Sequence, residues 1–158
     1  LNINGVGVFV NFNIDNLKRY IDDLELKYIQ LHGNEDSKYI DNIKKTGVKI
    51  IKKISIKNEV DPKELKNFNN ADFFLFDYKP EDGELPGGNA KSFDWNILKD
   101  IKFDKPWFLS GGINIDNIHH IRSKINPYGV DLSSGVEKEL GIKDNDIINN
   151  FMDKLNHA

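Results

Sequence analysis

Residues 107 to 114 read Trp107-Phe108-Leu109-Ser110-Gly111-Gly112-Ile113-Asn114, a short apolar run that ends in a serine and two glycines. Such a run of β-prone residues, bounded by turn residues, is typical of a strand buried on both faces of a parallel sheet. The segment that follows, Asn114 to Ile125, has the apolar spacing of a helix. A strand followed by a helix is the βα unit of an α/β fold.

The same βα pattern occurs five more times along the chain. The other predicted strands cover residues 6–10, 28–31, 48–51, 73–76 and 129–132. The helical segments after them are predicted at residues 14–21, 37–45, from the N-cap pair Asp61-Pro62 onward, near Trp95 and at 144–155. No linker divides the pattern, so residues 1–158 are predicted to form one domain. Six units fit either an open doubly wound sheet or most of an eight-unit barrel, which normally needs roughly 200 residues or more.

Composition excludes several classes of function. The chain has 25 acidic and 22 basic residues, a net charge of −3, and no basic block, so nucleic acid is not expected as a partner. No apolar run approaches the roughly 20 residues of a membrane span, so no membrane association is predicted. The absence of cysteine excludes disulfides and thiolate ligands from these residues. These features fit a cytoplasmic protein.

Most of the predicted strands end in polar residues, which make poor core. In α/β folds the carboxyl ends of the strands carry the ligand site. Because so many strands end in this way, the pattern favours a barrel, in which all strand ends face one mouth. The residues concerned are Asn11, Gln30, His32, Asp77, Ser110, Asp131 and Ser133.

Two of these strand ends have the character of phosphate-binding loops. The sequence Ser110-Gly111-Gly112 follows one strand and runs into a helix, where glycines admit an anion to the backbone and the helix start offers free N–H groups. The sequence Ser133-Ser134-Gly135 follows the last strand and adds two hydroxyls. In TIM barrels a phosphate often lies between the loops after strands seven and eight. The two loops together therefore predict a phosphorylated small-molecule ligand.

Asp77 closes the strand Phe73–Phe76, and a carboxyl group at the end of so apolar a run suits a general acid, although an N-cap or turn role is the alternative. His32 has no second histidine or carboxylate at ligand spacing, so no metal site is predicted. The sequence Gly87-Gly88-Asn89-Ala90-Lys91 lacks the spacing of a nucleotide-binding P-loop.

Taken together, these segments resemble the phosphoribosylanthranilate isomerases of tryptophan biosynthesis, in the family's order across nearly all of the chain. The matching stretches are Val6-Gly7-Val8-Phe9-Val10-Asn11, Gln30-Leu31-His32-Gly33, Leu75-Phe76-Asp77, Gly87-Gly88 with Phe93-Asp94-Trp95, Leu109-Ser110-Gly111-Gly112, and Asp131-Leu132-Ser133-Ser134-Gly135-Val136-Glu137.

The resemblance implies a TIM (β/α)₈ barrel and an intramolecular oxidoreductase, an aldose–ketose isomerase that needs no cofactor. Its reaction is the Amadori rearrangement of N-(5-phosphoribosyl)anthranilate to 1-(2-carboxyphenylamino)-1-deoxyribulose 5-phosphate. The general acid of the family corresponds to Asp77. The resemblance also places the phosphate on Gly111, Gly112, Ser133, Ser134 and Gly135, and places Gln30, His32 and Asp131 at the mouth of the barrel.

The sequence departs from the family in ways that bear on activity. The family's general base is a cysteine in a Lys-Ile-Cys-Gly motif at the end of the first barrel strand, and an arginine after the second strand helps hold the substrate. Neither segment occurs here, which implies that the chain supplies six units, strands three to eight of a partial barrel, and is inactive alone. Ala90 stands where a second loop glycine is usual, and Tyr78 where threonine is usual.

Three explanations remain open for the missing units. The chain is a piece of a normal enzyme, an inactive barrel that only binds phosphate, or a part that a separate segment completes. A function of another class is that of a non-catalytic phosphosugar-binding α/β protein.

Overall fold

The computed structural model describes residues 3–79 and 91–157, so the predicted Gly-rich loop at Gly87-Gly88 lies outside the described residues. The chain divides into two compact units. The first unit comprises residues 1–54 and 61–75, and the second comprises residues 55–60 and 76–158. Strands β3 and β4 each run from the first unit into the second.

The first unit contains three strand–helix pairs and the start of a fourth strand. In chain order these are β1 (Val6–Phe9), α1 (Ile14–Asp23), β2 (Tyr28–Leu31), α2 (Ser37–Lys44), β3 (Lys49–Ile56), α3 (Pro62–Asn67) and β4 (Phe73–Tyr78). The strands are hydrogen-bonded in sequence order, and β1, β2 and β3 pair in parallel. The helices begin at the polar caps Asn13, Asp36 and Asp61, whose side chains each accept a backbone N–H of the first turn.

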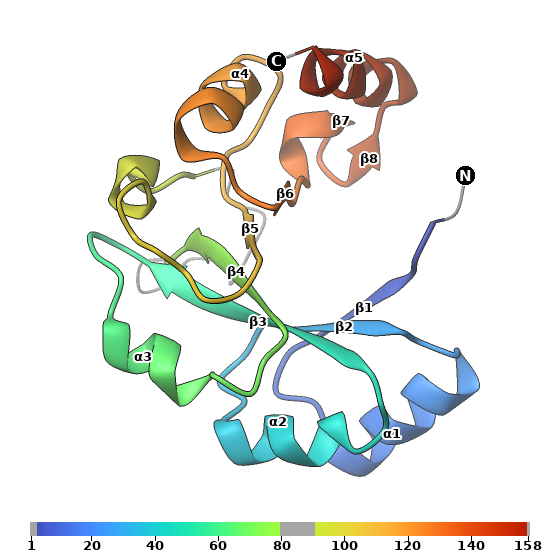
Figure 1. Cartoon of the computed structure of the whole chain (residues 1–158). Coiled ribbons are helices and arrows are strands. Elements are labelled where there is room, and N and C mark those ends of the chain that lie inside the picture. Colours follow the sequence, from blue (N-terminus) through green and yellow to red (C-terminus); the bar gives the residue numbers. More distant parts are fainter. Residues whose placement is uncertain (1–2, 80–90, 158) are drawn as a thin grey trace. The chain divides into compact units, whose positions relative to one another are not determined.

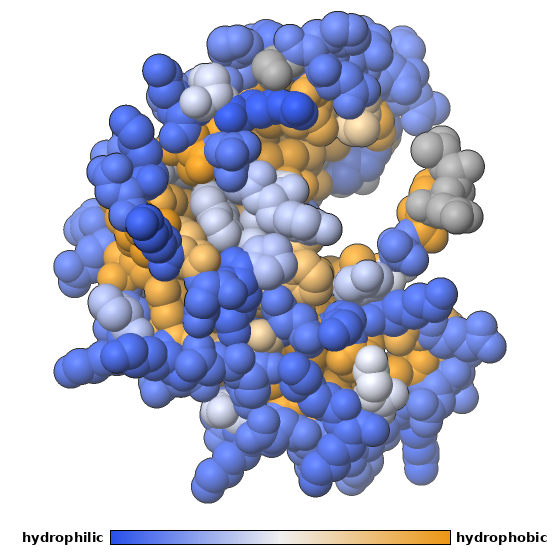
Figure 2. Space-filling model, viewed as in Figure 1, coloured by the Kyte–Doolittle hydropathy of each residue, from blue (hydrophilic) through white to orange (hydrophobic). Residues whose placement is uncertain are grey.

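Helices α1 and α2 lie on the same side of the sheet in Figure 1, and the core of the first unit lies between them and the strands. The period of the apolar residues explains this packing, because Leu17 and Ile21 of α1 and Ile40 and Ile43 of α2 each fall on one helix face. They pack with residues of β2 and β3, among them Ile29, Leu31 and Ile50. Figure 2 shows hydrophilic side chains over the solvent side of these helices.

The second unit continues the sheet with β5 (Trp107–Leu109) and β6 (Gly129–Val130), which pair in parallel. The helical elements are η1 (Trp95–Leu98), α4 (Ile118–His120), the π-helix η2 (Ile121–Ile125), η3 (Ser134–Val136) and α5 (Asn145–Asn156). A two-stranded antiparallel hairpin, β7 (Glu137–Glu139) with β8 (Ile142–Lys143), precedes α5. The rings of Phe76, Phe103 and Trp107 form an aromatic cluster with centroids 4.9 to 5.5 Å apart.

The predicted order of alternating strands and helices is confirmed, with five corrections. Strand β3 runs to Ile56 and so includes Lys52 and Lys53, which are buried. Burial on both faces is wrong for β1, where Val6 and Val8 are 43% and 60% exposed. Strand β6 is shorter than predicted, although the Asp131 N–H still donates to Leu109 O at 2.8 Å. The β7–β8 hairpin was not predicted, because its residues are mainly charged.

The fifth correction concerns the helix after β5, which begins at Ile118 and not at Asn114. The Asn114 side chain accepts hydrogen bonds from the N–H groups of Asp116 and Asn117, which holds the intervening residues in a turn. The helix ends at Asn126, whose φ of 51° is left-handed, and Pro127 follows. No helix among residues 3–79 and 91–157 is long and apolar enough to cross a membrane.

Candidate functional site

In the second unit, the end of β4 carries Asp77, which is only 8% exposed. Its Oδ1 accepts a hydrogen bond from the backbone N of Tyr78 at 2.9 Å. The neighbouring strand end is fixed by the N–H of Ser110, which donates to Phe76 O at 2.8 Å. The loop that follows β5 therefore begins beside the buried carboxyl group.

Gly111 brings this loop close to Asp77. Its φ is +90° and that of Gly112 is +68°, a region that side chains disfavour. A Cβ placed on Gly111 would lie 3.2 Å from Asp77 Oδ1 and 3.0 Å from the carbonyl oxygen of Lys91. Among the described residues, the N–H groups of Gly111 and Gly112 donate no hydrogen bond. The turn therefore offers two backbone donors next to a carboxyl group.

The loop after β6 lies directly against the loop after β5. A Cβ on Gly135 would stand 1.9 Å from the carbonyl oxygen of Ile113, a distance that no side chain can adopt. The absence of a side chain at Gly135 thus allows the loop after β6 to lie against Ile113, the residue that follows the Gly111-Gly112 turn. The two loops that the sequence singled out are neighbours in the structure.

Lys143 of the hairpin supplies a cation to the second loop. Its Nζ donates to the carbonyl oxygen of Ser133 at 2.8 Å and lies 3.1 Å from the Ser133 hydroxyl. The same ammonium group forms an ion pair with Glu137, and this hydrogen bond, followed by that from the Gly141 N–H, lowers the pKa of the Glu137 carboxyl. The hairpin therefore ties β8 to the start of η3.

In the first unit, the strand ends bring Asn11, Gln30 and His32 together. Asn11, with a left-handed φ of 48°, closes β1, and its side-chain oxygen accepts the Asn34 N–H at 2.6 Å. The Gln30 side-chain nitrogen lies 3.0 Å from Nδ1 of His32, so the two side chains predicted from the Gln-Leu-His-Gly stretch contact each other.

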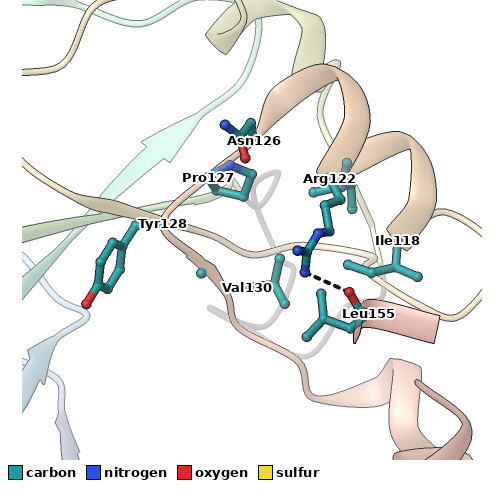
Figure 3. Close-up of a pocket in the computed structure, with 9 residues that line it drawn as sticks. Ile118, Arg122, Asn126, Pro127, Tyr128, Val130 and Leu155 are labelled. Carbon is teal, nitrogen blue, oxygen red and sulfur yellow. Dashed lines mark hydrogen bonds between the residues drawn. The ribbon is translucent and has the colours of Figure 1, made fainter. Parts of the chain in front are cut away.

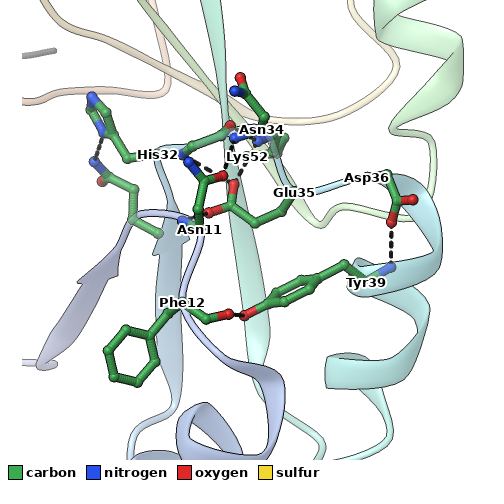
Figure 4. A network of polar contacts seen from close by, with 10 residues as sticks. Asn11, Phe12, His32, Asn34, Glu35, Asp36, Tyr39 and Lys52 are labelled. Atoms are coloured by element: carbon green, nitrogen blue, oxygen red, sulfur yellow. Dashed lines mark hydrogen bonds and ion pairs between the residues drawn. The ribbon is translucent and has the colours of Figure 1, made fainter.

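A network of polar contacts centred on Glu35 and Lys52 lies beside these residues (Figure 4). Both residues are buried and their side chains form an ion pair. The nearby Tyr39 hydroxyl donates to Phe12 O at 2.9 Å, and burial, with the negative charge of Glu35 as the second cause, raises the pKa of Tyr39. The electrostatic effect of Glu35 therefore reaches Tyr39.

Sequence reasoning missed Glu35, Lys52 and Lys143. The signal for Lys52 was available, because two lysines interrupt an otherwise isoleucine-rich strand and a lysine in such a position needs a partner. Glu35 gave no such signal, since its partners come from three separate segments of the chain.

A pocket of about 280 Å³ in the second unit does not involve the predicted site residues. It lies at the amino end of β6 and is lined by residues of α4, η2 and α5, with Arg122 donating to Leu155 O at 2.7 Å (Figure 3). Ligand sites of α/β folds lie at the carboxyl ends of strands, where Asp131 and Ser133 follow β6. No group of three or more possible metal ligands gathers within the described ranges.

Comparison with known proteins identifies a family. A sequence model described as N-(5'-phosphoribosyl)anthranilate (PRA) isomerase matches residues 2–154. The N-(5'-phosphoribosyl)anthranilate isomerase of Endomicrobium trichonymphae is 45% identical over 144 residues, which cover 90% of this chain and 67% of that protein.

Solved structures agree with the sequence match. The phosphoribosyl anthranilate isomerase of Thermotoga maritima superimposes with a TM-score of 0.82 at 30% identity, over 97% of this chain and 73% of that one. A phosphoribosyl anthranilate isomerase in complex with reduced 1-(o-carboxyphenylamino)-1-deoxyribulose 5-phosphate gives a TM-score of 0.78 at 29% identity, over 97% and 71% of the two chains. The predicted α/β class, with the fold of these isomerases, is confirmed.

The contact between the two loops gives a first prediction. Gly135→Ala should destabilise the protein by about 1–3 kcal/mol, because the new methyl group meets the Ile113 carbonyl and the loops must move apart. Urea denaturation followed by circular dichroism measures the loss. Gly5→Ala is the matched control, since a Cβ there meets nothing within 4 Å. Equal stability of the two variants would contradict the loop contact.

Proposed function

Because the chain belongs to the N-(5'-phosphoribosyl)anthranilate isomerase family, we propose that it provides the general acid and the phosphate site for the Amadori rearrangement of N-(5-phosphoribosyl)anthranilate. The product is 1-(2-carboxyphenylamino)-1-deoxyribulose 5-phosphate, and the reaction is a step of tryptophan biosynthesis. No cofactor takes part, and the enzyme acts in the cytoplasm.

The observation that carries this proposal is the approach of Gly111 to Asp77. In the substrate only a few covalent bonds separate the ring oxygen of the ribose from the phosphorus atom. An enzyme that protonates the ring oxygen while it holds the phosphate needs its acid next to its phosphate loop. The Gly111 turn, which would hold the phosphate, is in contact with the Asp77 carboxyl.

The proposed chemistry begins with a proton on Asp77. Transfer of this proton to the ring oxygen breaks the bond between that oxygen and C1′, and the nitrogen lone pair forms a Schiff base. A general base then removes the C2′ proton, the electron pair moves to the nitrogen, and the resulting enolamine tautomerises to the aminoketose. Asp77 is buried at the end of an apolar strand, and it is the group proposed to donate this proton.

The phosphate is proposed to accept hydrogen bonds from the N–H groups of Gly111 and Gly112 and from the Ser133-Ser134-Gly135 segment. Backbone donors in a turn with left-handed glycines form a concave anion site. Because α4 begins only at Ile118, the binding depends on the turn and not on a helix start. Gln30, His32 and Asp131 are proposed to line the substrate site.

The general base is proposed to come from outside these 158 residues, which contain no cysteine. With this base absent, the 158 residues would act as the six-unit part of a (β/α)₈ barrel, strands three to eight, and would bind phosphosugar without isomerising it. Binding without catalysis is also the alternative function, and the experiments below separate the two.

A test of the general base compares residues 1–158 with a longer fusion protein and with a control variant of that fusion. Residues 1–158 alone should convert substrate poorly, since a general base contributes roughly 10²–10⁴-fold. The same residues preceded by a segment with the Lys-Ile-Cys-Gly motif and the following arginine should be active. Loss of substrate fluorescence measures both, and the same fusion with the motif's cysteine changed to serine is the control. Equal rates in all three proteins would disprove the external base.

The acid is tested in whichever of these proteins is active. Asp77→Asn should reduce kcat by roughly 10²–10⁴-fold, because asparagine cannot donate the proton. The affinity for a phosphorylated product analogue should be nearly unchanged, as measured by calorimetry. Glu139→Gln, which changes an exposed carboxylate of β7, is the control. Normal turnover by Asp77→Asn would rule out its role as the acid.

The phosphate loop is tested by Gly112→Val. Loss of one hydrogen bond to a charged group costs about 1.5–3 kcal/mol, so the analogue should bind about tenfold more weakly or worse. Gly47→Val is the control, because Gly47 has a similar left-handed φ of +85° with open space around it, in the first unit. An affinity loss no greater than that of the control would count against the phosphate site.

A further inference from the structure

One carboxylate, that of Glu35, joins the loops that follow β1 and β2 in the first unit (Figure 4). Its Oε1 accepts the backbone N–H of Asn11 at 2.7 Å, and its Oε2 accepts that of Gly33 at 3.0 Å. Asn11 lies 24 residues before Glu35 in the sequence, so the carboxylate fastens two loops that the chain itself does not connect closely.

Lys52 of β3 binds both Glu35 and the loop that follows β2. Its Nζ lies 2.9 Å from Glu35 Oε2 and also donates to the carbonyl oxygen of Gly33 at 2.6 Å. The ammonium group also lies 5.2 Å from the centre of the Phe68 ring. The side chains of Lys52 and Glu35 are 2% and 1% exposed, so this is a fully buried ion pair.

Stability alone gives little reason to bury such a pair. Removing two charges from water is costly, and apolar residues of similar volume are often as stable or more stable in the same place. What an apolar pair does not do is hold two backbone N–H groups and a carbonyl at fixed positions. The pair therefore serves the geometry of the two loops.

The residue held most directly by these loops is His32. Its backbone N–H donates to Phe9 O at 2.8 Å, and the next residue, Gly33, is bound through both its N–H and its carbonyl oxygen. Gly33 also fits tightly against Asn11, because a Cβ there would lie 2.4 Å from the Asn11 side-chain oxygen. The Gln30 amide then fixes the imidazole through Nδ1.

We propose that Glu35, held by Lys52, is a positioning residue of the isomerase, which fixes the backbone and the ring of His32 for contact with the substrate. This inference rests on the proposed function for the role of His32. It concerns two residues that touch no substrate themselves and act through the loops they join.

The decisive variant removes both charges and keeps the volume, Glu35→Gln with Lys52→Met, in the protein that proves active. Glutamine has one acceptor oxygen, so the N–H of Asn11 or of Gly33 loses its partner. Without a buried charge the double variant should have a urea midpoint near that of the unchanged protein. Its kcat/KM should nevertheless fall roughly 10–100-fold, since small misplacements of a site have effects of this size. The affinity for inorganic phosphate should not change.

Lys49→Met is the matched control. Lys49 belongs to the same strand and pairs with Asp72 at 3.1 Å, but its side chain is 58% exposed. Loss of this pair should leave kcat/KM as it is. A stable double variant with unchanged kcat/KM would overturn the proposal.

A second variant covers the case in which the double variant does not fold. Glu35→Asp keeps the charge and shortens the side chain by one methylene, so it should lower kcat/KM about tenfold without loss of the ion pair. Normal kcat/KM in this variant would also refute the positioning role.

Nuclear magnetic resonance separates the inference from the proposed function. In the double variant Glu35→Gln with Lys52→Met the imidazole and amide signals of His32 should shift or broaden, while those of Gly111 and Gly112 stay in place. This readout needs no substrate. If neither residues 1–158 nor the fusion isomerises phosphoribosylanthranilate, the proposed function fails. Unchanged His32 signals would independently refute the positioning role.

Discussion

The buried ion pair between Glu35 and Lys52 constrains the two loops of the first unit that follow β1 and β2. A buried carboxylate must satisfy its oxygens, and here it does so with the backbone of two loops and one ammonium group. The turn at Asn11 in its left-handed conformation and the close approach of Gly33 follow from this demand. The same pairing allows Lys52 to lie within strand β3, because a lysine in a core strand is tolerated only where its charge is neutralised.

The second unit brings two loops together in another way. Its loops are brought together by the absence of side chains at Gly111 and Gly135, not by a shared charge. The closeness of Gly135 to Ile113 and of Gly111 to Asp77 leaves backbone N–H groups near the strand ends. Among the described residues, Lys143 brings a charge to the second of these loops, where it binds Ser133. The proposed anion site would therefore rest on backbone donors that lie beside the Asp77 carboxyl group.

How far the sequence predicts these features depends on whether the signal is local. Strand β2 has the predicted bounds, because an apolar run between turn residues is a local property of Tyr28 to Leu31. Asp77, Gly111 and Ser133 were predicted as site residues through the rule that ligand sites lie at strand ends, and that role stays a prediction. The second half of β3 was missed because Lys52 and Lys53 break the apolar pattern, and only the fold shows that Glu35 neutralises Lys52. The helix start after β5 was placed too early because Asn114 caps a turn in advance of the helix.

The two solutions differ in how they respond to substitution. At Gly111 and Gly135 the loops are close because a side chain is absent, so any side chain added there meets an oxygen of the neighbouring chain segment. In the first unit the Asn11 and Gly33 N–H groups require acceptor oxygens, and Lys52 requires a negative partner. Replacement of Glu35 by an uncharged residue would leave Lys52 a buried, uncompensated cation, which is strongly unfavourable. The proposed phosphate loops and the proposed substrate residues Gln30 and His32 are thus held in place by separate physical devices, and a substitution in one unit is expected to leave the other device intact.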